Sequence, residues 1–238
     1  MDPITIVTFI WTGERGYKLK HAAAVEAAIA RHATFPYRFV VISDQAPKGR
    51  FSFEVMPLPQ MAIDLPTFRP SPGYYSMLPK LWLFSGDARC LGKRIFYLDA
   101  DSIVTGDLEP IVTYAPEASF VCMLLPNKLQ SAMFMLETGA LTDVWATLTQ
   151  ELQEVPFLRG YHKSDQLWLR HRRLEDDYPH WPNREMGIYL LKDLDVNWPL
   201  PPLPDDARIV HPTGKTKPWN PIFTSRYPWA EEHYKWTT

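Results

Sequence analysis

The stretch Arg94-Ile-Phe-Tyr-Leu-Asp99-Ala-Asp101-Ser-Ile-Val decides the fold, because it is a hydrophobic run that ends in two carboxylates one residue apart. Such a run is typical of a strand that is buried on both faces of a parallel sheet. The strand would carry its charged pair to the carboxyl edge, where open α/β sheets bind ligands. Hard carboxylate oxygens suit Mg²⁺ or Mn²⁺, which commonly bridge protein carboxylates to substrate phosphates. The stretch therefore predicts a metal-assisted site for a nucleoside diphosphate compound.

A lone Asp-x-Asp is short and frequent, and both aspartates could instead end a strand and cap the next turn. A second motif near the C-terminus favours the metal site. Ile209-Val-His211-Pro-Thr-Gly214-Lys-Thr-Lys217-Pro-Trp219 places an imidazole, a glycine and a lysine at close spacing after a short apolar run. Histidine can complete a metal shell, glycine lets backbone approach a phosphate, and lysine acts on it as a point charge.

Together the two motifs resemble the signature of glycogenin-like and lipopolysaccharide-type glycosyltransferases, family 8 of the retaining sugar transferases, which have the GT-A fold. Weaker matches extend over most of the chain. Thr5-Ile-Val-Thr8-Phe resembles the family's first nucleotide-binding strand, Lys80-Leu81 its lysine site before the metal strand, and Ser164-Asp165-Gln166 its Asp-Gln element. The resemblance implies transfer of a sugar from a nucleotide sugar, with UDP as the nucleotide, to an acceptor hydroxyl with retention of configuration.

The resemblance also implies residue roles, which are expectations at this point. The metal ligands are expected to be Asp99, Asp101 and His211, and the histidine favours Mn²⁺ over Mg²⁺. The donor site is expected to comprise Thr8, Lys80, Asp99, Ala100, Gly214 and Lys217. The residues expected to take part in catalysis are Asp165, Gln166, Lys217 and Gln130, with Lys217 on the leaving diphosphate and the others beside the reacting sugar.

One departure from the family pattern concerns the acceptor side. Gln130-Ser-Ala132 stands where the family usually has Asn-x-Gly, so the amide is kept but a side chain now hinders close backbone approach of a sugar. This departure leaves open a degenerate transferase that binds a nucleotide sugar without turning it over. A nucleotidyltransferase with a similar α/β core also stays open, because it too would need paired carboxylates and a divalent ion. The acceptor, whether a saccharide, a lipid-linked group or a protein, is left open as well.

Length and charge suit one enzyme domain. The 238 residues suit a single α/β domain. The resemblance implies that this domain has a GT-A (Rossmann-like) fold, with a mixed, mainly parallel sheet flanked by helices. Its nucleotide- and metal-binding part would cover about 1–115, and its acceptor side with the C-terminal metal and phosphate loop about 116–238. The 25 basic and 27 acidic residues give a net charge of −2, which argues against a nucleic-acid partner.

Cysteine usage and the absence of targeting patterns indicate the compartment. Cys90 and Cys122 have no metal-type spacing, which argues against a disulfide scaffold or a zinc site and favours a reducing environment. The sequence has no secretory leader pattern and no apolar run of the roughly 20 residues that span a bilayer. We therefore expect a cytoplasmic protein without a transmembrane segment. A peripheral contact with the inner face of a membrane and assembly into a homo-oligomer stay open.

Hydrophobic patterning predicts alternating strands and helices. Besides the central strand, strands are expected at 4–10, 38–43, 53–58, 120–124 and 133–136, and helices at 19–31, 75–85, 141–152 and 165–172. A Pro-rich irregular segment is expected over 57–72, and a short helix or turn capped by Asp107 after the central strand. The tail, rich in proline and tryptophan, predicts extended structure held by aromatic packing. Trp11 and Tyr17 could stack on a nucleobase, although packing is the stronger interpretation.

Overall fold

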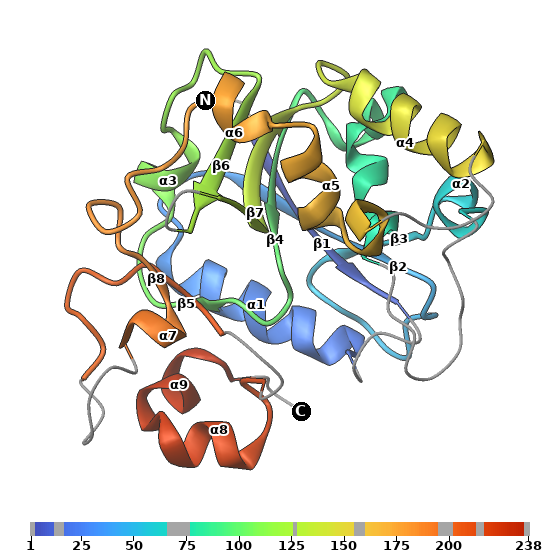
Figure 1. The fold of residues 1–238 in the computed structure, drawn as a ribbon. Helices are drawn as coiled ribbons and strands as arrows, with labels where there is room; N and C mark the ends of the chain where they lie inside the picture. The colour runs from blue at the N-terminus through green and yellow to red at the C-terminus, as the bar shows by residue number, and fades with distance from the viewer. Residues whose placement is uncertain are drawn as a thin grey trace.

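A computed structural model describes residues 3–11, 17–65, 77–125, 128–154, 160–194, 202–212 and 217–235. Within these residues, a large sheet of six strands lies between layers of helices, and a small sheet of three strands lies beside it (Figure 1). The strands of the large sheet are β1 (Ile4–Ile10), β2 (Tyr37–Ser43), β3 (Glu54–Pro57), β4 (Arg94–Leu98), β6 (Phe120–Leu124) and β7 (Leu129–Glu137). The strands of the small sheet are β5 (Ile103–Val104), β8 (Ile188–Leu190) and β9 (Ile209–His211).

The large sheet is mixed and mainly parallel, as predicted. Its order is β3-β2-β1-β4-β7-β6, and β3, β2, β1 and β4 pair in parallel. β7 runs antiparallel to both of its neighbours. Since β1 and β4 lie side by side at the centre, their carboxyl ends meet at one edge of the sheet. This arrangement confirms the predicted fold class and places Asp99 directly after the central strand β4.

Helices cover both faces of the large sheet. The α-helices are α1 (Leu19–His32), α2 (Gln60–Ile63), α3 (Glu109–Val112), α4 (Thr142–Glu154), α5 (Asp165–His171), α6 (Leu174–Asp177), α7 (Leu191–Leu194), α8 (Pro221–Arg226) and α9 (Pro228–His233). The 3₁₀ helices are η1 (Leu78–Phe84), η2 (Gly86–Leu91) and η3 (Gly160–Lys163). The small sheet and α1 lie on one face, and η1, α4 and α5 lie on the other.

Alternation along β1 explains why both faces of the sheet are buried. Ile6 and Ile10 pack into the core under α1, whereas Val7 and Phe9 pack into the core under η1, α4 and α5. β4 alternates in the same way, with Phe96 on the α1 side. Every residue of β1 is buried, Thr5 and Thr8 included, as expected of a central strand covered on both faces, so the mainly apolar runs of the sequence correctly predicted central strands.

The small sheet joins the two sequence motifs that lie far apart in the chain. β5 follows the Asp-x-Asp segment by one residue, and β9 ends at His211. The two strands pair antiparallel, with Ile103 opposite Val210 and Val104 opposite Ile209. The carboxylate pair and the histidine are therefore brought together by backbone hydrogen bonding.

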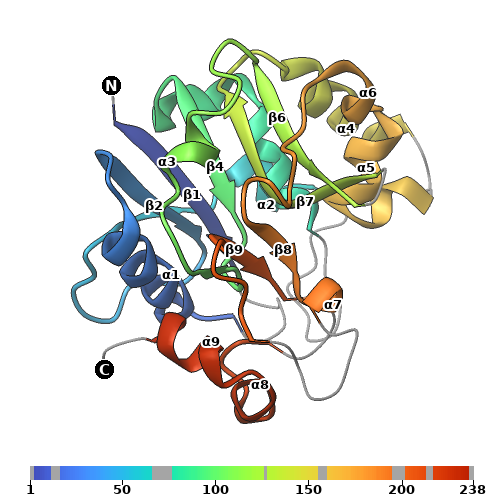
Figure 2. The ribbon, with the colours of Figure 1, turned by 90° about the vertical axis from the view of Figure 1, so that its left-hand side faces the viewer.

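The tail differs from the predicted extended structure. It contains α8 and α9; α9 lies next to α1 in both views, and α8 packs beside α9 (Figures 1 and 2). Pro221 and Pro228 each occupy the first turn of a helix, where a missing backbone N–H costs no hydrogen bond. Aromatic packing does hold the tail, as expected: Trp219 stacks on His21 of α1, with ring centroids 3.9 Å apart.

The structure also differs from the predicted helix over 75–85. The described part is the 3₁₀ helix η1, with Pro79 in its first turn and all of its residues buried. Asp107 accepts a hydrogen bond of 3.0 Å from the backbone N–H of Glu109, but the N-cap residue of α3 is Leu108, so Asp107 lies one residue before the predicted capping position. Among the described residues, none of the helices is both long enough and apolar enough to cross a membrane.

Candidate active site

A cavity of about 370 Å³ lies where the carboxyl ends of β1 and β4 meet the start of β7, the start of α5 and the end of β9. Nine residues predicted for the site line it: Lys80, Asp99, Ala100, Asp101, Gln130, Asp165, Gln166, His211 and Lys217. The other two predicted residues are Thr8 and Gly214. Thr8 is fully buried and does not line the cavity, whereas its neighbour Phe9 does, and Gly214 lies outside the described residues.

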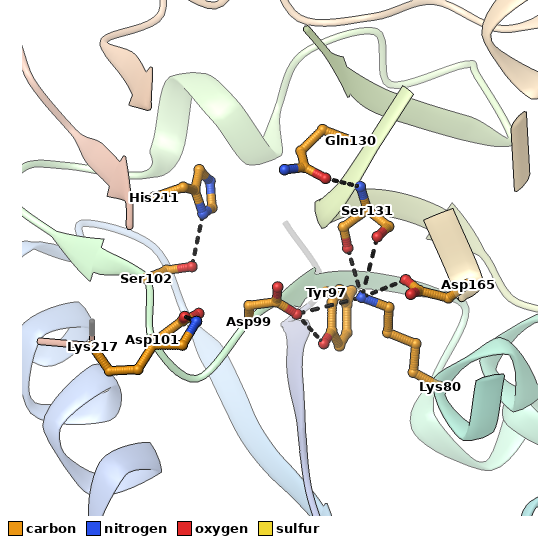
Figure 3. A network of polar contacts seen from close by, with 10 residues as sticks. All are labelled: Lys80, Tyr97, Asp99, Asp101, Ser102, Gln130, Ser131, Asp165, His211 and Lys217. Carbon is orange, nitrogen blue, oxygen red and sulfur yellow. Dashed lines mark hydrogen bonds and ion pairs between the residues drawn. The ribbon is translucent and has the colours of Figure 1, made fainter. Parts of the chain in front are cut away.

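Asp99 lines the cavity and lies between Lys80 and Asp101 (Figure 3). Its backbone N–H donates to the carbonyl of Ala132 at 2.8 Å, which ties the end of β4 to β7. Its Oδ1 accepts a hydrogen bond of 2.5 Å from the Tyr97 hydroxyl and lies 3.4 Å from Lys80 Nζ. Burial raises the pKa of Asp99 to about 6, and nearby Asp101 adds to this rise, against the lowering effects of Lys80 and Tyr97.

Lys80 is a buried cation that joins three elements. Its ammonium lies 2.7 Å from Asp165 Oδ2 and donates to the Ser131 carbonyl at 2.9 Å. It also lies over the Tyr97 ring, 4.7 Å from the centroid. Only 1% of its side chain is exposed. Since an uncompensated buried ammonium is unfavourable, these contacts fix Lys80 between two carboxylates and leave it facing the cavity.

Asp101 and Lys217 form a second ion pair on the other side of the cavity (Figure 3). Lys217 Nζ lies 2.5 Å from Asp101 Oδ2, and both side chains are largely buried. The ammonium is also 5.8 Å from the ring centroid of Tyr17, which lines the same cavity. Each carboxylate of the Asp-x-Asp pair thus lies beside one lysine ammonium.

His211 brings an imidazole to the cavity from β9. Its Nδ1 lies 2.9 Å from the Ser102 hydroxyl. Burial lowers the pKa of His211 to about 4, an effect that the charge of Asp101 opposes, so the ring is neutral near pH 7. Its Nε2 is buried and has no hydrogen-bond partner among the described residues. A neutral imidazole with one unsatisfied nitrogen is chemically suited to ligate a metal.

The chemical types of the candidate ligand side chains suit a divalent ion, but these side chains do not surround a common point in the structure. Asp99, Asp101 and His211 line one cavity and offer carboxylate oxygens and an imidazole nitrogen, a set that suits Mn²⁺. Within the described ranges, no three His, Cys, Asp or Glu side chains are grouped closely enough to hold a metal as they stand. The physical reason is visible in the ion pairs, because Lys80 and Lys217 provide the positive charge beside the two aspartates.

Two glutamines form the side of the cavity near α5. Ser164 caps α5 by accepting a 3.2 Å hydrogen bond from the Leu167 N–H, so Asp165 and Gln166 lie in the first turn. With its amide nitrogen toward Gln130, Gln166 donates to Gln130 Oε1 and accepts from Arg170 through its own oxygen. Gln130 Oε1 also accepts from the Ser131 N–H at 3.0 Å.

Ala132, which stands where the resembled family usually has glycine, lines the cavity beside Gln130 and Ser131. The departure noted in the sequence therefore lies at the site itself.

Three residues of the network carry no motif signal in the sequence: Tyr97, Ser102 and Ser131. Tyr97 could have been found from strand periodicity, because residues two apart point to the same face and Asp99 follows at that spacing. Ser102 becomes visible only once β5 and β9 are paired. Of the two aromatic candidates, Tyr17 lines the cavity and packs against Trp219, whereas Trp11 is buried beside Phe9 and does not line it.

The fold is similar to that of solved glycosyltransferase structures. The apo form of glycosyltransferase GlyE from Streptococcus pneumoniae TIGR4 has a TM-score of 0.62 at 12% identity, covering 96% of this chain and 60% of that one. The galactosyltransferase LgtC with donor and acceptor sugar analogues has a TM-score of 0.59 at 10% identity, covering 98% of both chains. Mouse xyloside xylosyltransferase 1 has a TM-score of 0.53 at 13% identity, covering 88% of this chain and 97% of that one.

These similarities concern the fold, since the identities are low. The chain spans less than two thirds of the GlyE chain but almost all of the LgtC chain. No protein-family model matches the sequence. No curated protein matches it in sequence either.

Proposed function

We propose that the protein is a metal-dependent glycosyltransferase that moves a sugar from a nucleotide sugar, with UDP as the nucleotide, to an acceptor hydroxyl with retention of configuration. One observation carries the proposal: nine residues predicted for such a site, from five separate sequence segments, line one cavity in a fold similar to that of glycosyltransferases. The imidazole of His211 is buried and neutral, and the Asp-x-Asp carboxylates lie near it; both features support a metal requirement.

The donor's diphosphate would lie between the two lysine-bearing sides of the cavity. Asp99, Asp101 and His211 are the residues that would hold Mn²⁺, which would supply positive charge to the diphosphate as its bond to the sugar breaks. Lys217 would then turn from Asp101 toward the diphosphate, because a phosphate oxygen offers the ammonium an equivalent charge. Lys80 would hold Asp99 and Asp165 in place, since its ammonium is already committed to both carboxylates.

The reaction exchanges one bond at the anomeric carbon for another. The acceptor oxygen forms a bond to that carbon, the bond from the carbon to the diphosphate oxygen breaks, and the acceptor proton leaves with the diphosphate or to solvent. Negative charge grows on the departing oxygen, so a cation placed beside it, as Lys217 would be, stabilises the transition state more than the bound donor. Asp165, Gln166 and Gln130 would orient the sugar ring at the opposite side of the cavity.

The experiment that tests this proposal is a thermal-shift panel of nucleotide sugars, each with and without Mn²⁺. Ligands that bind the native state raise its apparent stability, so the donor should raise the melting temperature, and more with Mn²⁺ than without. The selected donor is then incubated with the protein, and release of nucleoside diphosphate is measured. The anomeric configuration of the product, read by NMR, tests retention. Absence of any stabilising nucleotide sugar would contradict the proposal.

The same assays separate the two other functions. Slow hydrolysis of the donor in the absence of an acceptor would exclude a protein that only binds nucleotide sugars. Release of pyrophosphate from a nucleoside triphosphate would instead identify a nucleotidyltransferase. Asp101→Asn is the matched control in both assays, because it removes one ligand charge from the end of the Asp-x-Asp segment and should abolish Mn²⁺-dependent donor binding while the protein still folds.

A further inference from the structure

Ser102 lies directly opposite His211 across the small sheet. β5 and β9 pair antiparallel with Ile103 opposite Val210, and continuing this register by one residue places Ser102 opposite His211. The distance from Ser102 Oγ to His211 Nδ1 is 2.9 Å. Ser102 is fully buried, and its backbone N–H donates to the Asp99 carbonyl at 3.0 Å. The serine is therefore fixed at both its backbone and its side chain.

The hydrogen bond at Nδ1 determines what the other ring nitrogen can do. A neutral imidazole carries one proton, so Nε2 has a free lone pair only when Nδ1 holds that proton and donates it to a neighbour. Metal-ligating histidines almost always donate their second N–H in this way. The Ser102 hydroxyl is the partner that Nδ1 has, while Nε2 is buried and without a hydrogen bond among the described residues.

We infer that Ser102 is a positioning residue for His211: by accepting a hydrogen bond from Nδ1–H, it holds the imidazole with the Nε2 lone pair available to a divalent ion. The inference rests on the proposed metal-dependent function. The hydroxyl of Ser102 is also an uncharged partner for Nδ1, whereas a carboxylate at this position would add a third negative charge beside Asp99 and Asp101. Because a hydroxyl both donates and accepts, Ser102 can also satisfy Nδ1 when the metal is absent.

The test measures Mn²⁺ affinity directly, from the electron paramagnetic resonance signal of free Mn²⁺, without relying on turnover. Ser102→Ala should weaken Mn²⁺ binding about 10- to 100-fold, the usual effect of removing such a partner. Ser102→Thr keeps the hydroxyl and should restore most of the affinity. Thr138→Val is the control, because it removes another largely buried hydroxyl, hydrogen-bonded at 2.6 Å to the Gly92 carbonyl near the opposite end of β4.

A double-mutant cycle with His211→Ala distinguishes positioning from a general structural effect. If Ser102 acts through the imidazole, Ser102→Ala should change Mn²⁺ affinity little in the His211→Ala background. An equal loss in both backgrounds, or unchanged affinity in Ser102→Ala alone, would overturn the inference while leaving the proposed function in place. If the native protein binds neither Mn²⁺ nor a nucleotide sugar, the proposed function fails and the inference fails with it.

Discussion

Lys217 Nζ lies 2.5 Å from Asp101 Oδ2, so a lysine ammonium lies beside one of the carboxylates proposed to hold a divalent ion. Both side chains are mostly shielded from solvent, which strengthens their attraction relative to a surface pair. A cation entering this part of the cavity must therefore compete with the ammonium for the same carboxylate. This relationship gives one lysine two opposite effects, depending on whether the donor is bound.

Lys217→Met should bind Mn²⁺ more tightly than the native protein when no donor is present, because the competing ammonium is gone. With donor and metal saturating, the same variant should have a kcat lower by about a hundredfold, which corresponds to about 2.7 kcal/mol. Isothermal titration with Mn²⁺ and steady-state kinetics measure the two effects separately. The donor dissociation constant should rise less than kcat falls, since the charge grows during bond cleavage.

Two results would contradict this role for Lys217. Weaker Mn²⁺ binding in Lys217→Met would mean that the ammonium does not compete for Asp101. A native kcat once donor is saturating would mean that Lys217 contributes only to uniform binding. Lys93→Met is a suitable control, because Lys93 is an exposed lysine at the opposite end of β4.

Lys80→Met should destabilise the fold as well as the site. The ammonium lies between Asp165 at 2.7 Å and Asp99 at 3.4 Å, and its removal leaves neighbouring carboxylates without their shared cation. Breaking a buried pair by removing one partner costs about 3 kcal/mol or more of unfolding free energy. Urea unfolding of the variant, compared with Lys93→Met, measures this loss.

A second substitution shows whether charge is the cause of the Lys80 effect. Lys80→Met combined with Asp165→Asn removes one of the two negative charges, so the double variant should recover part of the lost stability. Failure of Asp165→Asn to restore any stability would assign the effect to packing of the lysine stem instead. A Lys80→Met variant within about 0.5 kcal/mol of the native protein would contradict the buried-pair interpretation altogether.

Local sequence signals were sufficient for most of the large sheet. β1 was predicted at its observed bounds, and β4 was recognised as a strand that ends before Asp99, because a continuous apolar run has only one favourable place in an α/β fold. α1 and α4 were predicted to within two residues at each end, because their amphipathic patterns are long. These elements contain enough residues for a period to be visible.

The small sheet and the 3₁₀ type of η1 could not be predicted in the same way. β5 has two residues and β8 and β9 have three each, which is too short for alternation to emerge. Every residue of η1 is buried, so its sequence has no polar face to reveal a helical period. In the tail, the many prolines predict extended chain, although Pro221 and Pro228 begin helices.

The contrast between local sequence signals and tertiary contacts also explains which site residues could be identified from the sequence. Asp99, Asp101, His211 and Lys217 belong to motifs whose chemistry is recognisable from residue type and spacing. Ser102 contacts His211 across 109 residues of sequence, so its partner depends on the pairing of β5 with β9. Contacts that depend on tertiary register cannot be read from spacing along the chain.

Mn²⁺ binding should weaken as the pH falls through about 6, the raised pKa of Asp99, because protons then compete for its carboxylate. The Tyr97 hydroxyl donates to this carboxylate at 2.5 Å and thereby lowers the pKa of Asp99 against the effect of burial. Tyr97→Phe removes that hydrogen bond but keeps the ring, so the pKa of Asp99 should rise further. The midpoint of Mn²⁺ binding against pH should therefore move to a higher pH.

Titrations of Mn²⁺ between pH 5 and 8 test the Tyr97 prediction. Tyr189→Phe is the matched control, because its hydroxyl bonds to Asp206, which does not line the site cavity, and its loss should leave the midpoint unchanged. An unchanged midpoint in Tyr97→Phe would indicate that the hydroxyl does not act on the ionised form of Asp99.

His21 should make the fold sensitive to acid. Burial, with smaller effects from Lys20 and Lys18, lowers the pKa of His21 from 6.5 to about 4, and the neutral ring stacks on Trp219. The unfolded chain therefore binds a proton more readily than the folded chain between these two pH values. The stability due to neutral His21 is fully present above pH 6.5 and is lost progressively as the pH falls toward 4.

His21→Phe should flatten the dependence of unfolding free energy on pH between 6.5 and 4, because phenylalanine keeps an aromatic ring against Trp219 but cannot take up a proton. The variant also loses the acceptor that His21 Nδ1 offers to the Lys18 N–H, so its stability should be lower at pH 7.5. The slope, rather than the absolute value, is thus the quantity to compare. Other groups that titrate in this range, including His211, are present in both proteins, and their contributions cancel in the difference. Equal slopes in urea unfolding of the two metal-free proteins would mean that His21 is not protonated on unfolding over this pH range.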